Sequence, residues 1–158
     1  MNLNNSERIK MINNKTIRLL LLLICLVLVL PVIGCSANQV DQEYIDFSAR
    51  ASENYLIAIN NRDFNSFSRD LNKDMKEALP EEEFLIFADQ IEEIIGTYEP
   101  GSKKLDQTKK DSGYIVISYN AKYTGESEDV AVTISLQKTG DKIEIGGSWF
   151  NSPKLRGE

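Results

Sequence analysis

The spacing of apolar residues changes once along this chain, at Gly96, and that change limits what the chain can fold into. Before Gly96, apolar side chains recur every three or four residues, which places them on one face of a helix. After Gly96 they alternate with polar side chains, as in strands with one buried face. Helices followed by a run of strands predict an α+β fold, in which the helices pack on one face of an antiparallel sheet.

Three helices are expected before the period changes. The first covers residues 41–61, and Asp63 should cap a short second helix that ends near Asn72. The third begins at residues 79–83, Leu-Pro-Glu-Glu-Glu, because a proline needs no amide donor at a helix start and carboxylates favour the positive end of the helix dipole. Its apolar stripe is expected to be buried and contains Phe84, Phe87, Ala88, Ile91, Ile94 and Ile95.

Four strands are expected after the helices. A less regular strand lies within residues 97–108, and alternating strands cover residues 114–123, 130–137 and 143–149. Short turns rich in Gly, Ser and Asp separate the strands by gaps of hairpin size, so they should form an antiparallel meander. The pair Gly146-Gly147 suggests a bulge or bend in the last strand.

The inward-facing positions of the clearest strands are aliphatic, apart from Tyr119, Tyr123 and Trp149. No carboxylate shares this face. The three aromatic side chains could line a ligand cavity, since such pockets are mostly apolar with few polar groups. The alternative interpretation is ordinary core packing, because a buried aromatic residue needs only one partner for its polar tip.

The N-terminal part has the pattern of a cleaved export signal. Residues 19–30 are an unbroken apolar run of 12 residues, and Lys15 and Arg18 precede it. A membrane-spanning helix needs about 20 apolar residues, so this run is short. The alternatives are an uncleaved anchor and, for Cys35, a buried thiol without a role. Met11 could be the true start of translation.

Residues 32–35, Val-Ile-Gly-Cys, resemble the lipobox of bacterial-type lipoproteins. The resemblance implies that Cys35 becomes the mature N-terminus and carries a diacylglycerol thioether, which would hold the protein on the extracytoplasmic face of the cell membrane. We therefore expect a signal peptide over residues 1–34, a lipidated tether over 35–40, the α+β domain over 41–150 and a C-terminal tail over 151–158.

Charge and composition exclude several functions for the mature chain. Residues 1–34 hold four of the 18 basic and one of the 24 acidic residues, so the mature part carries 14 basic and 23 acidic residues, a net charge of −9. Such a chain repels nucleic acid. It contains no histidine, the usual general base and transition-metal ligand, and no thiol pair for a disulfide. We expect no cofactor and no metal.

The acidic clusters are interpreted as helix-capping and solvated side chains rather than as metal ligands. They lie at residues 81–83, 92–93 and 126–129, and no EF-hand spacing accompanies them. No residue is assigned a catalytic role.

Four segments also resemble a family of small secreted or lipoprotein domains of unknown function with the nuclear transport factor 2-like, cystatin-like fold. They are residues 60–64 (Asn-Asn-Arg-Asp-Phe), 79–84 (Leu-Pro-Glu-Glu-Glu-Phe), 95–96 (Ile-Gly) and 146–150 (Gly-Gly-Ser-Trp-Phe). The resemblance implies a cone-like arrangement of three helices on a curved four-stranded sheet. That fold hosts isomerases, cyclases and dehydratases as well as domains that only bind, so it does not decide the function.

We expect a non-catalytic domain that binds a small apolar ligand or a protein partner. One alternative is an isomerase, cyclase or hydrolase that uses Tyr119 or Tyr123 together with an acid that the expected strand registers misplace. The other is a module that forms homodimers through its sheet. A buried Asp or Glu beside a tyrosine would favour the enzyme, and a filled cone would favour association.

Overall fold

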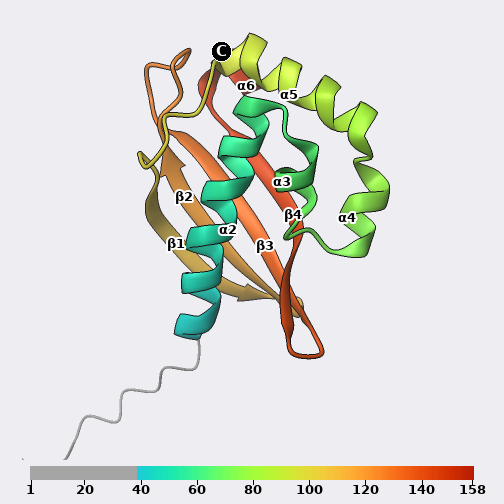
Figure 1. The fold of residues 1–158 in the computed structure, drawn as a ribbon. Coiled ribbons are helices and arrows are strands. Elements are labelled where there is room, and N and C mark those ends of the chain that lie inside the picture. The colour runs from blue at the N-terminus through green and yellow to red at the C-terminus, as the bar shows by residue number, and fades with distance from the viewer. Residues whose placement is uncertain (1–38) are drawn as a thin grey trace, which may run out of the picture. The chain divides into compact units, whose positions relative to one another are not determined.

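The computed structural model describes residues 39–158 (Figure 1). Cys35 and the expected signal peptide lie outside these residues, so the lipid anchor stays a prediction. The helices are α2 (Gln42–Asn61), α3 (Phe64–Ser68), α4 (Lys73–Ala78), α5 (Glu81–Ile95) and α6 (Pro153–Arg156). The strands are β1 (Lys104–Asp111), β2 (Tyr114–Ala121), β3 (Val130–Thr139) and β4 (Lys142–Asn151). None of these helices is long and apolar enough to cross a membrane.

The strands form one antiparallel sheet in the order β1-β2-β3-β4, so each strand pairs with its neighbour in sequence. Helix α2 crosses one face of the sheet, and α3, α4 and α5 follow it on the side of β4 (Figure 1). The core lies between these helices and the inward side chains of β2, β3 and β4, where Tyr55, Phe67 and Ile134 are buried. The expected α+β architecture, with helices on one face of a curved four-stranded sheet, is confirmed.

Two helix ends that the sequence pattern indicated are confirmed. Asp63 caps α3, since its carboxylate accepts a hydrogen bond of 3.1 Å from the Ser66 amide. Gly96 ends α5 with φ at 78°, a conformation that favours glycine. A side chain at the facing Gly125 would meet the Ile95 carbonyl carbon at 2.7 Å, so both glycines are needed where α5 meets the loop after β2.

The number of helices differs from the expectation, since the described residues form five rather than three. The second expected helix ends at Ser68, because Leu71 forms a parallel bridge with Ile145 of β4 and the chain there is extended. Asn72 then caps the additional helix α4. No residue of α4 is fully buried, so it lacks the apolar stripe that would have revealed it. Helix α6 lies in the segment expected as a tail.

A bulge in β4 reverses the direction of the side chains that follow it. Ser135 pairs with Gly147 while its neighbour Leu136 pairs with Ile145, so Gly146 is the extra residue. As a result Phe150, rather than Trp149, shares the inward face with the buried residues of β3. Trp149 faces outward and is 69% exposed, so its expected inward position is wrong. The sequence indicated the bulge but not its effect on the register.

Candidate ligand-binding groove

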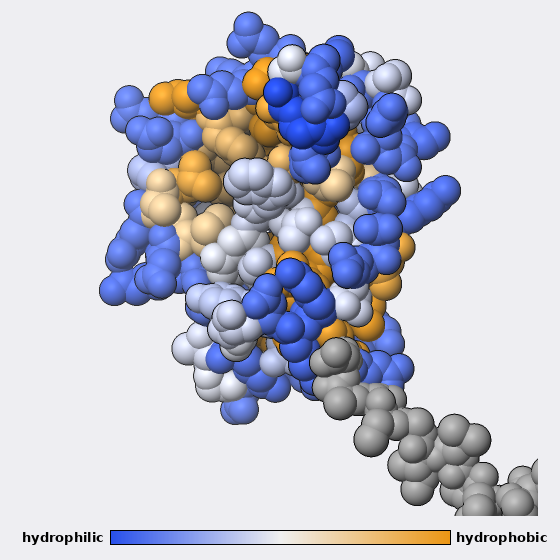
Figure 2. All heavy atoms as spheres, turned by 180° about the vertical axis from the view of Figure 1, so that it is seen from behind, coloured by the Kyte–Doolittle hydropathy of each residue, from blue (hydrophilic) through white to orange (hydrophobic). Residues whose placement is uncertain are grey.

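An apolar groove lies where α4 and α5 face the end of β4, with α6 at one end. Its volume is about 450 Å³, within the usual range for small-ligand sites. Figure 2, which views the molecule from behind, shows apolar side chains gathered at the upper left, in the region of α5 and β4, with hydrophilic side chains around them. The groove is lined by Met75, Leu79, Phe87, Gln90, Ile91, Ile94, Ser148, Trp149, Phe150 and Leu155.

Helix α5 supplies one wall because its apolar arc is wider than the core requires. One part of the arc, including Phe84 and Ala88, is buried against the core. The other part turns Phe87 and Ile94 toward the groove, and Ile94 is 41% exposed. The expectation that Ile94 belongs to the buried stripe is therefore wrong. The width of the arc was the signal in the sequence that more than one surface contacts this helix.

The edge of β4 supplies the opposite wall. Ser148 and Phe150 face inward and Trp149 faces outward, yet all three line the groove. Consecutive residues of a strand point to opposite faces of the sheet, so a single groove can touch all three only along the strand's edge. The groove therefore runs beside the free edge of the sheet and not inside the cone.

The polar groups at the groove are few and uncharged. They belong to Gln90 and Ser148, and the Ser148 hydroxyl shares a hydrogen bond of 2.7 Å with the buried Tyr55 hydroxyl. Burial raises the pKa of Tyr55 to about 12, although the bond to Ser148 opposes this rise. Tyr55 is therefore neutral at physiological pH and can only donate or accept a hydrogen bond through Ser148.

The structure separates the three aromatic residues expected to form one cavity, because only Trp149 lines the groove. The Tyr123 ring packs edge-on against the Phe150 ring, with the two ring centroids 6.5 Å apart. Its hydroxyl is buried and has no hydrogen-bond partner among the described residues. Burial is the main cause that raises the Tyr123 pKa far above its usual range. The outer edge of Tyr123 borders a second, polar hollow of about 200 Å³.

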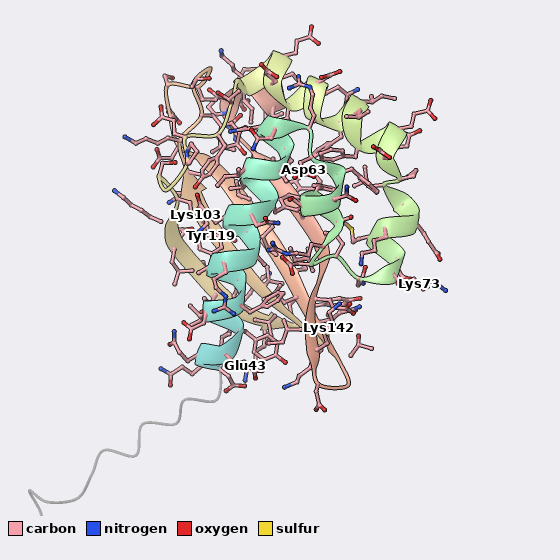
Figure 3. The ribbon with its side chains drawn as sticks, viewed as in Figure 1. Glu43, Asp63, Lys73, Lys103, Tyr119 and Lys142 are labelled. Atoms are coloured by element: carbon pink, nitrogen blue, oxygen red, sulfur yellow. The ribbon has the colours of Figure 1, made fainter. Side chains whose placement is uncertain are left out.

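Tyr119 lies away from the groove, beside α2 (Figure 3). Its hydroxyl donates a hydrogen bond of 2.9 Å to Ser48, and the Lys103 ammonium stands 5.0 Å from the centre of its ring. Burial raises the pKa of Tyr119, and a hydrogen bond to Ser48 opposes this rise. Both contacts are those of a packed structural side chain, so Tyr119 is not part of the groove.

The sequence did not indicate a carboxylate that lies beside a tyrosine on the helix side of the sheet. Glu53 of α2 accepts hydrogen bonds from the Tyr98 hydroxyl at 3.0 Å and from the Gly101 amide at 2.8 Å, and it forms an ion pair with Lys103 at 3.1 Å. Burial works to raise the Glu53 pKa, but these three donors outweigh it and hold the pKa below its usual value. Through these contacts the ionised Glu53 carboxylate links α2 to the loop before β1.

No curated protein matches this chain. The sequence pattern of one family, described as "Protein of unknown function (DUF3887)", matches residues 52–143. The chain belongs to this family. The expectation of a family without an assigned function is therefore confirmed, and the match to DUF3887 includes α5, the main helix of the groove, while the end of β4 follows it.

Two solved structures resemble this chain at low identity. One, titled Rd1NTF2_05 and carrying five substitutions, has a TM-score of 0.43 and 13% identity, covering 68% of this chain and 99% of its own. The other, a de novo designed protein with a curved beta-sheet, has a TM-score of 0.40 and 14% identity, covering 66% of this chain and 99% of its own. Within residues 39–158, no three His, Cys, Asp or Glu side chains lie close enough together to hold a metal ion.

Proposed function

We propose that this protein is a non-catalytic binding domain, held on the extracytoplasmic face of the membrane by a lipid on Cys35, and that its ligand occupies the groove between α5 and β4. The observation that carries the proposal is the exposed apolar lining of the groove, which includes Trp149 at 69% and Ile94 at 41% exposure. Covering apolar surface of this kind with a ligand removes it from water and so lowers the free energy.

The charges of α5, which forms one wall of the groove, favour one class of ligand. No charged side chain lines the groove, and α5 carries six acidic residues and no basic one. An anionic amphiphile such as a fatty acid would be repelled by this helix. We therefore expect the apolar part of the ligand to carry a neutral or cationic group, with the Ser148 hydroxyl and Gln90 as its hydrogen-bonding partners.

The arrangement of acids and tyrosines supports binding over catalysis. A general base must reach the proton that it removes, within about 3 Å or through one water. Glu53 lies beside Tyr98, but it is engaged by Lys103 and the Gly101 amide and does not line the groove. The hydroxyls nearest the groove belong to Ser148 and Tyr55, and each is bonded to the other.

A fluorescence titration tests the groove, because Trp149 is the only tryptophan. Residues 37–158 are titrated with N-phenyl-1-naphthylamine, an uncharged apolar probe, and we expect saturable quenching of Trp149. Ile94→Glu should weaken binding by about tenfold or more, because a charge in the groove loses its hydration when the probe binds. Leu85→Glu is the matched control: Leu85 is 39% exposed on the same helix but does not line the groove. Equal affinities of the two variants would refute the assignment.

The anchor is tested separately in cells that process lipoproteins. Cys35→Ser should release the chain into the aqueous fraction or block its processing, since acyl chains contribute about 0.8 kcal/mol per buried CH₂ group to membrane binding. Membrane retention of the variant at full mature size would contradict a lipid on Cys35.

A second candidate function is dimerisation through the outer face of the sheet. The outward positions at the centre of β2, β3 and β4 carry no charge, although Lys, Arg, Asp and Glu make up 27% of the chain. They are occupied by Val116, Ser118, Ala131, Thr133, Ser135 and Trp149. Light scattering of Thr133→Lys tests this candidate, because two lysines brought together in a symmetric interface should shift a dimer to monomers.

A further inference from the structure

The two edges of the sheet differ in how they are protected against pairing with another strand. Five of the eight residues of β1 are charged, and its pairing with β2 is irregular at Asp106. Charges and bulges are the usual means by which edge strands avoid added strands. β4 also has a bulge, at Gly146, but the part beyond it that borders the groove, Ser148-Trp149-Phe150, carries no charge and no proline. The less protected edge is thus the one beside the apolar groove.

The chain itself makes the first backbone hydrogen bonds along the free edge of β4. The Ile145 amide donates to the Asp70 carbonyl at 2.8 Å, and the Asn72 amide donates to the Ile145 carbonyl at 2.9 Å. Helix α4 then turns away from the sheet. Among the described residues, no further backbone hydrogen bond reaches the free edge of β4 beyond Ile145. Beyond the bulge, residues 147–151 extend for about 17 Å, which is long enough for a short peptide strand.

Acidic side chains of α5 lie beside the groove. Glu83 precedes Phe87 by one turn and so lies toward the groove side of the helix, whereas Glu93 lies one turn past Gln90, on the flank of that face. Neither takes part in an ion pair with another described residue, whereas Asp89 and Glu92 are both paired with Arg62. An extended ligand in the groove therefore has the Glu83 carboxylate near one end, and α5 offers it no basic side chain.

We propose that the occupant of the groove is an extended peptide segment of a partner protein, which adds a strand to β4, places alternate apolar side chains in the groove, and carries basic residues beside the acidic helix α5. The inference rests on the proposed function, because it uses the same groove. The main chain of the peptide supplies hydrogen bonds to the β4 edge, and its alternate side chains supply the apolar contact. The charges argue against a second copy of this chain, since its own α5 carries six acidic residues and would face the glutamates of the first copy.

Peptide binding to the full chain in neutral detergent micelles tests the proposal, with empty micelles as the blank. The probe is a dye-labelled peptide, acetyl-Lys-Lys-Val-Thr-Phe-Thr-Val-Lys-Lys-amide, followed by fluorescence anisotropy. One comparison peptide has Glu in place of every Lys. The other has methyl groups on alternate backbone nitrogens, which removes strand pairing and keeps the side chains. We expect each change to weaken binding by about tenfold or more.

Hydrogen exchange gives a second readout, since bound peptide should slow the exchange of amides in residues 146–151 and leave β1 unchanged. Equal binding of the methylated peptide, or no binding of the parent peptide, would overturn strand addition. If sedimentation shows a dimer and this dimer does not bind the peptide, the proposal is also overturned, because the occupant of the groove would then be a second copy of the chain. If the peptide result overturns strand addition but N-phenyl-1-naphthylamine still binds saturably, the groove itself remains supported. If neither the peptide nor N-phenyl-1-naphthylamine binds, the groove is refuted as a binding site.

Discussion

The buried hydroxyl groups of Tyr123 and Tyr55 differ in whether they have a hydrogen-bond partner. The Tyr123 hydroxyl lacks a partner among the described residues, while the Tyr55 hydroxyl is bonded to Ser148 at 2.7 Å. Removing an unsatisfied buried group relieves its desolvation cost, so we expect Tyr123→Phe to leave the free energy of unfolding unchanged or to raise it by about 1 kcal/mol. Tyr55→Phe should lower it by about 1 kcal/mol. Urea denaturation measures both, and a marked loss in Tyr123→Phe would reveal a partner for this hydroxyl.

Trp149 is another residue whose surroundings decide the effect of a substitution. Because its side chain is 69% exposed, Trp149→Ala should lower the free energy of unfolding by less than about 1 kcal/mol. Phe67 is buried at 1% exposure, so Phe67→Ala should cost about 3–5 kcal/mol. Thermal denaturation compares the two variants. Similar large losses would mean that Trp149 packs into the core after all.

At the scale of elements, Glu53 links α2 to the loop that contains Tyr98, Gly101 and Lys103. The Glu53 pKa is lower in the folded protein than in the unfolded chain, so its contribution to stability is present above the unfolded pKa and is lost as the pH falls through the folded pKa. We expect Glu53→Gln to be less stable near neutral pH and to lose less stability on acidification below about pH 4.5. Parallel unfolding curves of both proteins across pH would contradict this role.

The β4 bulge explains which part of the site could be predicted from the sequence. Alternation of apolar residues indicated the inward faces of β2 and β3 correctly, since Ile117, Tyr119, Val132 and Ile134 are buried. Alternation in β4 failed at Gly146, because one extra residue moves every later side chain to the opposite face. A glycine pair signals a possible bulge, but which residue is unpaired depends on the partner strand.

The division of α5 between core and groove could not be predicted for a related reason. Its apolar arc shows that the helix is amphipathic, but only the tertiary arrangement decides that Phe84 packs in the core and Ile94 borders the groove. Helix α4 was missed because helices without a buried stripe have no periodic signal. The order and type of the main elements followed from local patterns, whereas the groove follows from contacts between elements distant in sequence.

For the molecule as a whole, the described residues share one apolar core built from α2, α3, α5 and the sheet. A chain that starts at Ala37 should therefore unfold in one cooperative transition without metal or disulfide. Circular dichroism during thermal unfolding, with and without EDTA, checks this expectation. A dependence on added calcium, or two separate transitions, would show that the core is not sufficient for folding.

The ligand is expected to bind between α5 and the edge of β4 and not in the core between the sheet and the helices. Methyl NMR of residues 37–158 with N-phenyl-1-naphthylamine distinguishes these two places, because each methyl group reports its own surroundings. We predict saturable shift changes in Leu79, Ile91, Ile94 and Leu155, which line the groove. The buried Ile117 and Ile134 should stay unchanged. Shifts centred on those two core residues, or no saturable shift at any methyl group, would rule out binding in the groove.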